Sequence, residues 1–376
     1  MRVLFDYQAF QAQRIGGVSK SFCEILRHLP GHVKWEIGIS QSDNVYLQEL
    51  LPDIEPVRFS YGKGFFRGKD RMLTLLDRLG LIRTAESLNK EAALKALGKG
   101  DFDVFHPTYF DPYFLQRLRD KPFVLTIHDL IPERFPEYFS RNDIQIRGRK
   151  ALIEHADAIV AVSENTKKDI MEIYGVPAER ISVAYHGGPE PRATDSATSP
   201  HKPYFLFVGS RGKYKNFSAL LKGFSEFCEK NRDVDLICTG HPFSADESSD
   251  FARLGLEHRI LHRNASEEEM VKLYNGAIAL VYPSRYEGFG MPVLEAFAYH
   301  CPVLLGTGSS LPEVGGDVAI YLDPSFDDMA EKLEYFTSMS RAERDRLIKK
   351  GLCRLKEFSW EKAAEKYTEI YSAITR

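Results

Sequence analysis

Short apolar runs recur along the chain and are separated by segments with helical periodicity. In the first half the runs are 2–7, 33–40, 104–109, 123–130, 158–163 and 181–187. In the second half they are 204–210, 234–240, 259–264, 277–284, 303–307 and 318–323. Short apolar runs that alternate with helices are typical of parallel sheets covered on both faces. The pattern therefore predicts an α/β fold.

Helix-start signals follow several of these runs. Ser163 is placed to cap a helix that ends near Gly175, and Ser266 forms a capping box with Glu269. Ser163 is first a helix cap, and a ligand role for it is secondary.

The stretch 190–203, EPRATDSATSPHKP, is rich in Pro, Ser and Thr, lacks periodicity and is interpreted as a linker. It divides the chain into domains 1–190 and 203–358. We expect two Rossmann-like doubly wound domains that face each other across a cleft at the carboxyl ends of both sheets, where such folds bind ligands.

Composition narrows the class of protein. A chain of 376 residues is too long for a single core, and 43% hydrophobic with 27% charged residues excludes general disorder. The 50 basic and 53 acidic residues nearly balance, which argues against a nucleic-acid partner. No apolar run is long enough to span a membrane, and the first residues lack a secretory signal. Five scattered cysteines without a CxxC pair indicate reduced thiols, so we expect a cytoplasmic protein.

The stretch PSRYEGFGMPVLEAF (283–297) carries the most specific chemistry. Gly288 and Gly290 predict a tight loop that a ligand can approach closely, and Pro292 suits the first turn of a helix whose free N–H groups attract anions. Glu287 in the loop and Glu295 in the helix can then face one cleft and accept hydrogen bonds from sugar hydroxyls. The alternative is a solvated Glu287 with Glu295 as an ordinary helix acid.

With its two glutamates eight residues apart, EGFGMPVLEAF resembles the signature of the family-4 retaining glycosyltransferases, which have the GT-B fold. Other stretches resemble the same family in order and spacing: IGGVSKSF (15–22), TIHDL (126–130), VSENTKKDI (162–170), FVGSRGKYKNF (207–217), NASEEEMVKLYNGAIALVYPS (264–284) and SSLPEVGGDVAIYLDP (309–324). Residues 45–100 match nothing in the pattern.

The resemblance implies roles for residues of the second half. Glu295 would bind the nucleotide ribose, Glu287 would lie against the donor sugar, and Lys215 with Arg211 would grip the diphosphate. Preplaced cations stabilise the charge that a leaving diphosphate gains. Lys213 is the alternative to Arg211. The expected donor-binding set is completed by Gly288, Phe289, Gly290, Met291, Pro292, Val293, Leu294 and Ser310. The backbone of 309–314 is expected to add a helix N-terminus facing phosphate, and Glu313 in it to be structural or to contact the nucleotide indirectly.

Residues of the first half are expected at the opposite side of the cleft. Gly16 and Gly17 open a helix and are assigned to donor binding, with a plain tight turn as the competing interpretation. The resemblance implies that His128, at the end of a strand, touches the donor sugar and orients the reacting groups.

Other binding motifs are missing from the sequence. Asp101–Asp103 and Asp233–Asp235 have DxD spacing, but each begins or precedes a strand, so we interpret them as strand-entry acids and expect no metal site. No GxGxxG follows the first strand, and neither a P-loop nor a GxSxG motif occurs. We therefore predict no cofactor beyond the nucleotide-sugar substrate.

The resemblance implies transfer of a hexose from a GDP- or UDP-linked donor with retained anomeric configuration. A phosphate oxygen would take the acceptor proton, so the two glutamates are not a hydrolase pair. The expected acceptor is a saccharide or a lipid-linked saccharide in polysaccharide or lipopolysaccharide synthesis. The alternatives are a GT-B nucleotide-sugar epimerase and a non-catalytic sugar-nucleotide-binding protein.

Two segments complete the expectations. The last helix, within 360–376, is expected to pack back on the first domain. The basic and apolar stretch 61–83 could lie on an anionic membrane at the inner face, and its alternative is a helical surface insertion.

Overall fold

The computed structural model describes residues 1–57, 77, 83–139, 144–193 and 202–375. The stretch 61–83, apart from Asp77 and Arg83, and residues 194–201 of the expected linker lie outside these ranges.

The first half of the chain forms two short parallel sheets that adjoin. Their strands are β1 (Arg2–Asp6), β2 (Lys34–Gly38), β3 (Val104–His106), β4 (Val124–Ile127), β5 (Ala158–Ala161) and β6 (Ile181–Val183). The orders are β2-β1-β3 and β4-β5-β6, and a parallel bridge between Phe105 and Phe123 joins β3 to the second set. The helices are α1 (Gln8–Ala12), α2 (Gly17–His28), α3 (Val45–Leu50), α5 (Ala85–Lys99), α6 (Ile131–Arg134), α7 (Ile144–His155) and α8 (Glu164–Tyr174).

The second half forms one six-stranded parallel sheet of order β12-β11-β10-β7-β8-β9. Its strands are β7 (Tyr204–Phe207), β8 (Asp235–Cys238), β9 (Ile260–His262), β10 (Leu280–Tyr282), β11 (Val303–Leu305) and β12 (Ile320–Tyr321). Its helices are α9 (Phe217–Lys230), α10 (Ala245–Arg253), α11 (Glu267–Gly276), α12 (Met291–Ala298), α13 (Leu311–Gly315), α14 (Met329–Ser338) and α15 (Arg341–Leu355). The strand order reverses between β7 and β10, and such a switch point is where open α/β sheets bind ligands.

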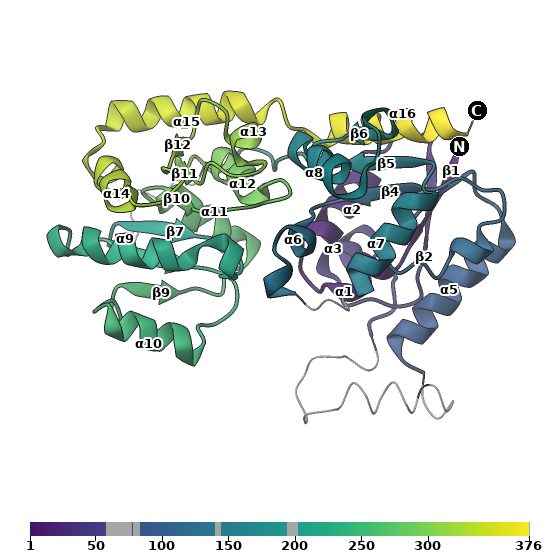
Figure 1. Ribbon diagram of the computed structural model, residues 1–376, viewed down its shortest axis with the longest axis horizontal. Coiled ribbons are helices and arrows are strands. Elements are labelled where there is room, and N and C mark those ends of the chain that lie inside the picture. The colour runs from purple at the N-terminus through teal and green to yellow at the C-terminus, as the bar shows by residue number, and fades with distance from the viewer. Residues whose placement is uncertain (58–76, 78–82, 140–143, 194–201, 376) are drawn as a thin grey trace.

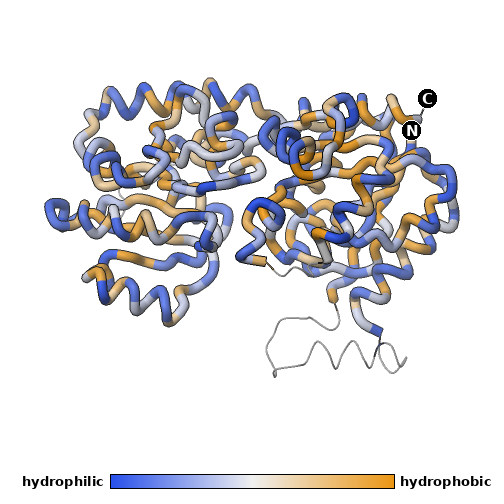
Figure 2. Tube along the Cα trace, viewed as in Figure 1, coloured by the Kyte–Doolittle hydropathy of each residue, from blue (hydrophilic) through white to orange (hydrophobic). Residues whose placement is uncertain are grey.

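Each apolar run of the sequence contains one strand, so the predicted α/β class is confirmed. The strands β4, β5, β7, β8, β10 and β11 are almost wholly buried, and Figure 2 shows them as the most hydrophobic parts of the chain. The predicted caps are also present. The Ser163 hydroxyl accepts from the Thr166 N–H at 3.0 Å, and Ser266 with Glu269 forms the capping box. Gly175 ends α8 with a φ of 67°, in the left-handed region that favours glycine.

The last helix, α16 (Trp360–Ile374), returns to the first half of the chain. Figure 1 shows α15 along the second sheet and α16 along the first. Trp360, Tyr367 and Tyr371 share one core with Val3 and Phe5 of β1. We propose that 1–190 together with α16 form a first domain and 203–358 a second, and these two names are used below. Within the described residues, no helix is long and apolar enough to cross a membrane.

Candidate functional site

A lysine and a glutamate meet at the switch point of the second sheet. Lys215 lies in the turn after β7, and Glu287 follows β10, the strand that neighbours β7. The Lys215 Nζ donates to both carboxylate oxygens of Glu287 at 2.6 and 2.7 Å, and also to the Tyr282 hydroxyl at 2.9 Å. The structure therefore brings together two of the residues that the sequence assigned to catalysis.

The pair is nearly buried, with side-chain exposures of 12% for Lys215 and 8% for Glu287. Burial alone would lower the pKa of Lys215, but the Glu287 carboxylate and its neighbours outweigh burial and raise that pKa. Lys215 therefore stays cationic at neutral pH. A fixed positive charge in a water-poor site can stabilise negative charge that develops on a bound diphosphate.

The loop that carries Glu287 is held by the first domain. The Ser163 hydroxyl donates to the Gly288 carbonyl oxygen at 2.7 Å, and the Thr166 hydroxyl donates to the same oxygen at 3.2 Å. A Cβ placed on Gly288 would lie 1.8 Å from the backbone oxygen of His128. This close approach between the domains is what requires glycine at position 288.

The serines before α13 hold the same loop from the other side. The Ser310 hydroxyl contacts the carbonyl oxygens of Glu287 at 3.0 Å and Phe289 at 2.8 Å, and the Glu287 N–H donates to the Ser309 hydroxyl at 2.6 Å. Ser310 was assigned to donor binding. Here its hydroxyl is engaged by the loop, so it supports the Glu287 backbone.

The rest of the loop leads into α12 as the sequence predicts. Gly290 has a φ of 108°, and Pro292 lies in the first turn of the helix. The side chains of Phe289, Val293 and Leu294 are buried in the core, so only their backbone can meet a ligand.

His128 follows β4 and lies across the domain boundary from this loop. Its ring stacks on His186 at a centroid distance of 5.5 Å and meets the edge of Phe22 at 5.7 Å. Burial, followed by the charges of His186 and its neighbours, lowers its pKa well below the ordinary value, so the ring is neutral. Its Nε2 is buried and has no hydrogen-bond partner among the described residues. That nitrogen is therefore available to a substrate atom.

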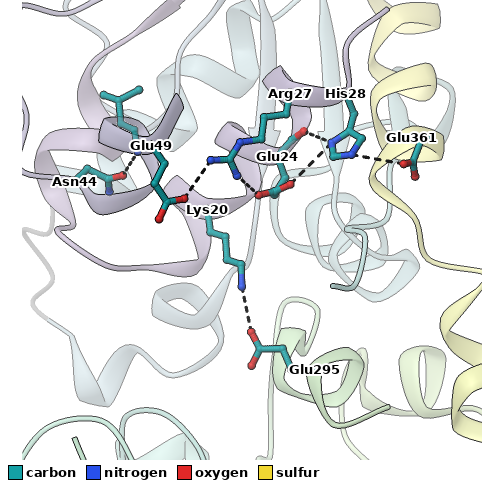
Figure 3. A network of polar contacts seen from close by, with 9 residues as sticks. Lys20, Glu24, Arg27, His28, Asn44, Glu49, Glu295 and Glu361 are labelled. Atoms are coloured by element: carbon teal, nitrogen blue, oxygen red, sulfur yellow. Dashed lines mark hydrogen bonds and ion pairs between the residues drawn. The ribbon is translucent and has the colours of Figure 1, made fainter. Parts of the chain in front are cut away.

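Glu295 faces the first domain from α12. Its carboxylate accepts from the Tyr274 hydroxyl at 2.9 Å and from the Lys20 ammonium of α2 at 3.4 Å, a contact that Figure 3 shows reaching between the domains. Burial alone would lower the pKa of Lys20, yet Glu295 and Tyr46 outweigh it and raise the pKa. Sequence reasoning missed Lys20. The signal was a basic residue one helical turn after Gly16 and Gly17.

Lys20 lines a cavity of about 760 Å³ between the domains. The cavity is bounded by one face of α2, the connection Gly188–Arg192, the start of α11 at Glu267, Met291, and the region where α15 meets α16. A volume of this size is typical of small-molecule sites. Figure 3 shows the polar wall along α2, where Arg27 bridges Glu24 and Glu49, and His28 lies 3.5 Å from Glu361.

Gly16 and Gly17 lie at the N-terminus of α2, one turn before Lys20. Gly17 is exposed, and a Cβ on it would meet no atom within 4 Å. Its backbone is therefore open to a ligand, as its assignment to donor binding requires.

Arg211 contacts Glu247, and its Nη1 is buried without a hydrogen-bond partner among the described residues. Its guanidinium is 5% exposed and pairs with Glu247 at 2.5 Å, and it donates to the backbone oxygen of His241 at 2.7 Å. It also lies over the ring of Phe243. The structure thus uses Arg211 to hold the 241–247 segment, because a buried guanidinium needs a carboxylate and several acceptors close by. Lys213 lies over the ring of Tyr138 at 5.1 Å, on the first domain.

The acids with DxD spacing lie at strand entries. Asp101 forms an ion pair with Arg2, the Arg2 N–H donates to Asp103 at 2.8 Å, and Asp235 lies 3.2 Å from Arg259. The carboxylates of Asp101, Asp103 and Asp235 are therefore engaged by Arg2 and Arg259 at the amino ends of the strands.

Two domains built on parallel sheets, with helices between the strands, are the architecture of the GT-B fold. Residues 15–188 match the model for Glycosyltransferase Family 4, and residues 192–352 match the model for Glycosyl transferases group 1. The chain belongs to the family-4 glycosyltransferases, enzymes of class EC 2.4.

Individual relatives agree with this placement. The chain is 27% identical to O-antigen chain mannosyltransferase B of Escherichia coli, over 72% of its own length and 74% of that protein. It is 29% identical to O-antigen chain mannosyltransferase RfbU of Salmonella typhimurium, over 53% of its length and 56% of that protein. Among solved structures, HepE of Anabaena, crystallised with UDP and glucose, superposes with a TM-score of 0.73 at 15% identity and covers 99% of both chains. At 15% identity, the similarity to HepE shows a shared fold and no more.

Proposed function

We propose that this chain transfers a hexose from a UDP- or GDP-linked sugar to a hydroxyl of a saccharide or lipid-linked saccharide, with retained anomeric configuration, in polysaccharide synthesis. The observation that carries the proposal is the nearly buried Lys215–Glu287 pair at the switch point, on a loop whose Gly288 packs against the backbone of His128. The pair supplies a cation and a carboxylate, and the His128 ring, whose Nε2 has no partner among the described residues, is the group that the first domain would add.

Each of these groups has a distinct task in the proposed reaction. Lys215 stabilises the diphosphate as it leaves, because its charge is in place before the reaction begins. Glu287 orients Lys215 and accepts from hydroxyls of the donor sugar. His128 is neutral, so in the proposed reaction its Nε2 hydrogen-bonds a sugar oxygen without adding a second positive charge.

Recognition of the nucleotide is assigned to Glu295 and to the backbone at the start of α12. Tyr274 and Lys20 each hold one oxygen of the Glu295 carboxylate, and a carboxylate has further lone pairs for ribose hydroxyls. The N-terminus of α12 supplies free N–H groups that suit a phosphate. As the resemblance to the family implies, the acceptor proton goes to a phosphate oxygen of the leaving group in the proposed reaction.

The relatives support the class of donor and acceptor. Two are named O-antigen chain mannosyltransferases, and the Anabaena structure holds UDP and glucose. A hexose attached to a nucleoside diphosphate, and a growing saccharide as acceptor, fit all of them.

The proposal is tested by product analysis. The protein is incubated with UDP- and GDP-hexoses and with oligosaccharide acceptors, and the new linkage is examined by NMR. We expect an acceptor-dependent product whose anomeric configuration equals that of the donor. An epimerised nucleotide sugar formed without acceptor would replace the proposal with the epimerase alternative. An inverted product would contradict retention.

A further inference from the structure

The N-terminus of α8, in the first domain, receives a carboxylate from the second domain. The N–H of Glu164 donates to Glu313 Oε1 at 2.7 Å, and the N–H of Asn165 donates to Glu313 Oε2 at 3.3 Å. Figure 1 shows α8 at the edge of its domain that faces α12 and α13. The first N–H groups of a helix have no partner within the helix and carry partial positive charge, so a carboxylate is favourable there.

The same turn of α8 also binds the Glu287 loop. The hydroxyls of Ser163 and Thr166 both donate to the Gly288 carbonyl oxygen, and both residues are fully buried. One turn further on, Asp169 accepts from the hydroxyl of Tyr286. The start of α8 therefore contacts the residues on both sides of Glu287.

Glu313 is itself rigidly placed in the second domain. Arg354 of α15 donates to the backbone oxygens of Glu313 at 2.5 Å and Val314 at 3.3 Å. Three residues earlier, the Ser310 hydroxyl contacts the backbone oxygen of Glu287. Glu313 is only three residues from Ser310, whose hydroxyl contacts the Glu287 backbone. A shift of Glu313 away from α8 would therefore also shift Glu287.

We propose that Glu313 is a positioning residue, which docks the second domain on α8 and thereby fixes the Glu287 loop in its working place. The set formed by Ser163, Thr166, Gly288 and Glu313 is called the α8 clasp below. The inference rests on the proposed function and adds to it the contact that sets the closed geometry.

The clasp connects the two domains. Some of the residues assigned to nucleotide binding lie in the second domain alone and do not depend on the clasp for their positions. Lys215 and Glu295 both belong to the second domain. A nucleotide can therefore bind when the clasp is open, but transfer requires His128 of the first domain beside Glu287. Opening also admits water to the activated donor.

The test compares Glu313→Gln and Glu313→Ala with wild type, and uses Glu331→Gln as a matched control. Glu331 is an exposed glutamate in the first turn of α14. Three quantities are measured: the radius of gyration by small-angle X-ray scattering, the dissociation constant for UDP and GDP by calorimetry, and kcat for transfer.

We expect Glu313→Ala to increase the radius of gyration and to lower kcat about 10- to 100-fold, because small displacements of reacting groups cost that much. The nucleotide dissociation constant should stay at the wild-type value, and the ratio of donor hydrolysis to transfer should rise. Glu313→Gln keeps one acceptor oxygen and should lie between Glu313→Ala and wild type. Glu331→Gln should match wild type in all three measurements.

Unchanged scattering and unchanged kcat in Glu313→Ala would overturn the inference. A nucleotide affinity that falls in step with kcat would also overturn it, because Glu313 would then act through the donor site or through folding. Scattering needs no substrate. A wild type that transfers no sugar, together with a clasp that opens in Glu313→Ala, would therefore contradict the proposed function alone.

Discussion

Gly288 is the residue at which the two domains approach most closely within the catalytic loop. An added methyl group would lie 1.8 Å from the His128 carbonyl oxygen, and 2.9 Å from Cβ of Asp129. The His128 carbonyl oxygen belongs to the backbone, so it cannot move aside as the end of a flexible side chain can. We expect Gly288→Ala to displace the loop and to lower kcat about 100-fold, a cost that displacement of about 1 Å can produce.

Gly98 in α5 provides the matched control for that substitution. A Cβ on Gly98 would meet no atom within 4 Å. Gly98→Ala should therefore keep full activity and raise the free energy of unfolding by about 0.5–1 kcal/mol. Wild-type turnover in Gly288→Ala would show that the domains do not meet there during catalysis.

Three histidines with lowered pKa values make the stability of the protein depend on pH. Burial lowers the pKa of His106 and of His186 to about 3, and lowers that of His128 well below its ordinary value. Below pH about 6.5 these histidines are protonated in the unfolded chain but neutral in the folded one, so the unfolded chain binds more protons. Their contribution is complete above pH 6.5 and is lost as the pH falls toward 3.

Urea unfolding between pH 7.5 and 5 measures this dependence. Below pH about 6.5, we expect the free energy of unfolding to fall by about 1.4 kcal/mol per pH unit for each histidine that is kept neutral, and above that pH we expect no such fall. His106→Gln removes one titrating group and should reduce the slope. A free energy that is constant across this range would contradict the burial of neutral histidines.

At the scale of elements, α16 is joined to the first sheet by a polar chain inside the core. The Tyr371 hydroxyl lies 2.7 Å from Nδ1 of His106, and Nε2 of the same ring lies 2.9 Å from the Thr126 hydroxyl. Tyr371→Phe keeps the ring and leaves His106 Nδ1 without its partner. We expect this change to lower the free energy of unfolding by about 1–3 kcal/mol.

Tyr335 in α14 is the control for Tyr371, since it is 44% exposed. Tyr335→Phe should change stability by less than about 0.5 kcal/mol in the same urea titration. Equal effects of the two substitutions would contradict the anchoring of α16 through His106.

The elements of the fold could be predicted from the sequence, because local patterns determine them. Apolar runs gave the strands, and the Ser163 and Ser266 signals marked helix starts that the structure contains. The sequence also assigned Lys215 and Glu287 to one donor site. Their direct contact depends on β7 and β10 being neighbouring strands, which the structure shows.

Contacts between distant segments could not be predicted in the same way. Arg211 was assigned with Lys215 to the diphosphate, and its contacts with Glu247 and the His241 carbonyl oxygen could not be predicted, because only the folded 241–247 segment supplies them. Lys20 and Glu313 reach across the domain boundary, and no periodicity in the chain reports such a partner. The roles assigned to the site residues remain predictions for the experiments above.

At the scale of the whole molecule, the domains meet through contacts from both sides of the catalytic loop. Lys20 of α2 contacts Glu295 on one side, and the α8 clasp holds Gly288 and Glu313 on the other. A cavity of about 760 Å³ lies beside the Lys20 contact. We therefore propose that the second domain binds the nucleotide and that docking of the first domain completes the site for transfer.

The central claim is that Lys215 belongs to a site for a nucleotide-diphospho sugar. It is tested most directly by thermal unfolding with UDP-, GDP-, ADP- and dTDP-sugars, on wild type, Lys215→Ala and Lys222→Ala. Lys222 is an exposed lysine of α9 and serves as the control. A ligand at 100 times its dissociation constant stabilises the folded state by about 2.7 kcal/mol. The account predicts that one nucleotide class, UDP or GDP, stabilises wild type and Lys222→Ala but not Lys215→Ala. Equal stabilisation of Lys215→Ala, or no stabilisation of wild type by any of the four, would contradict it.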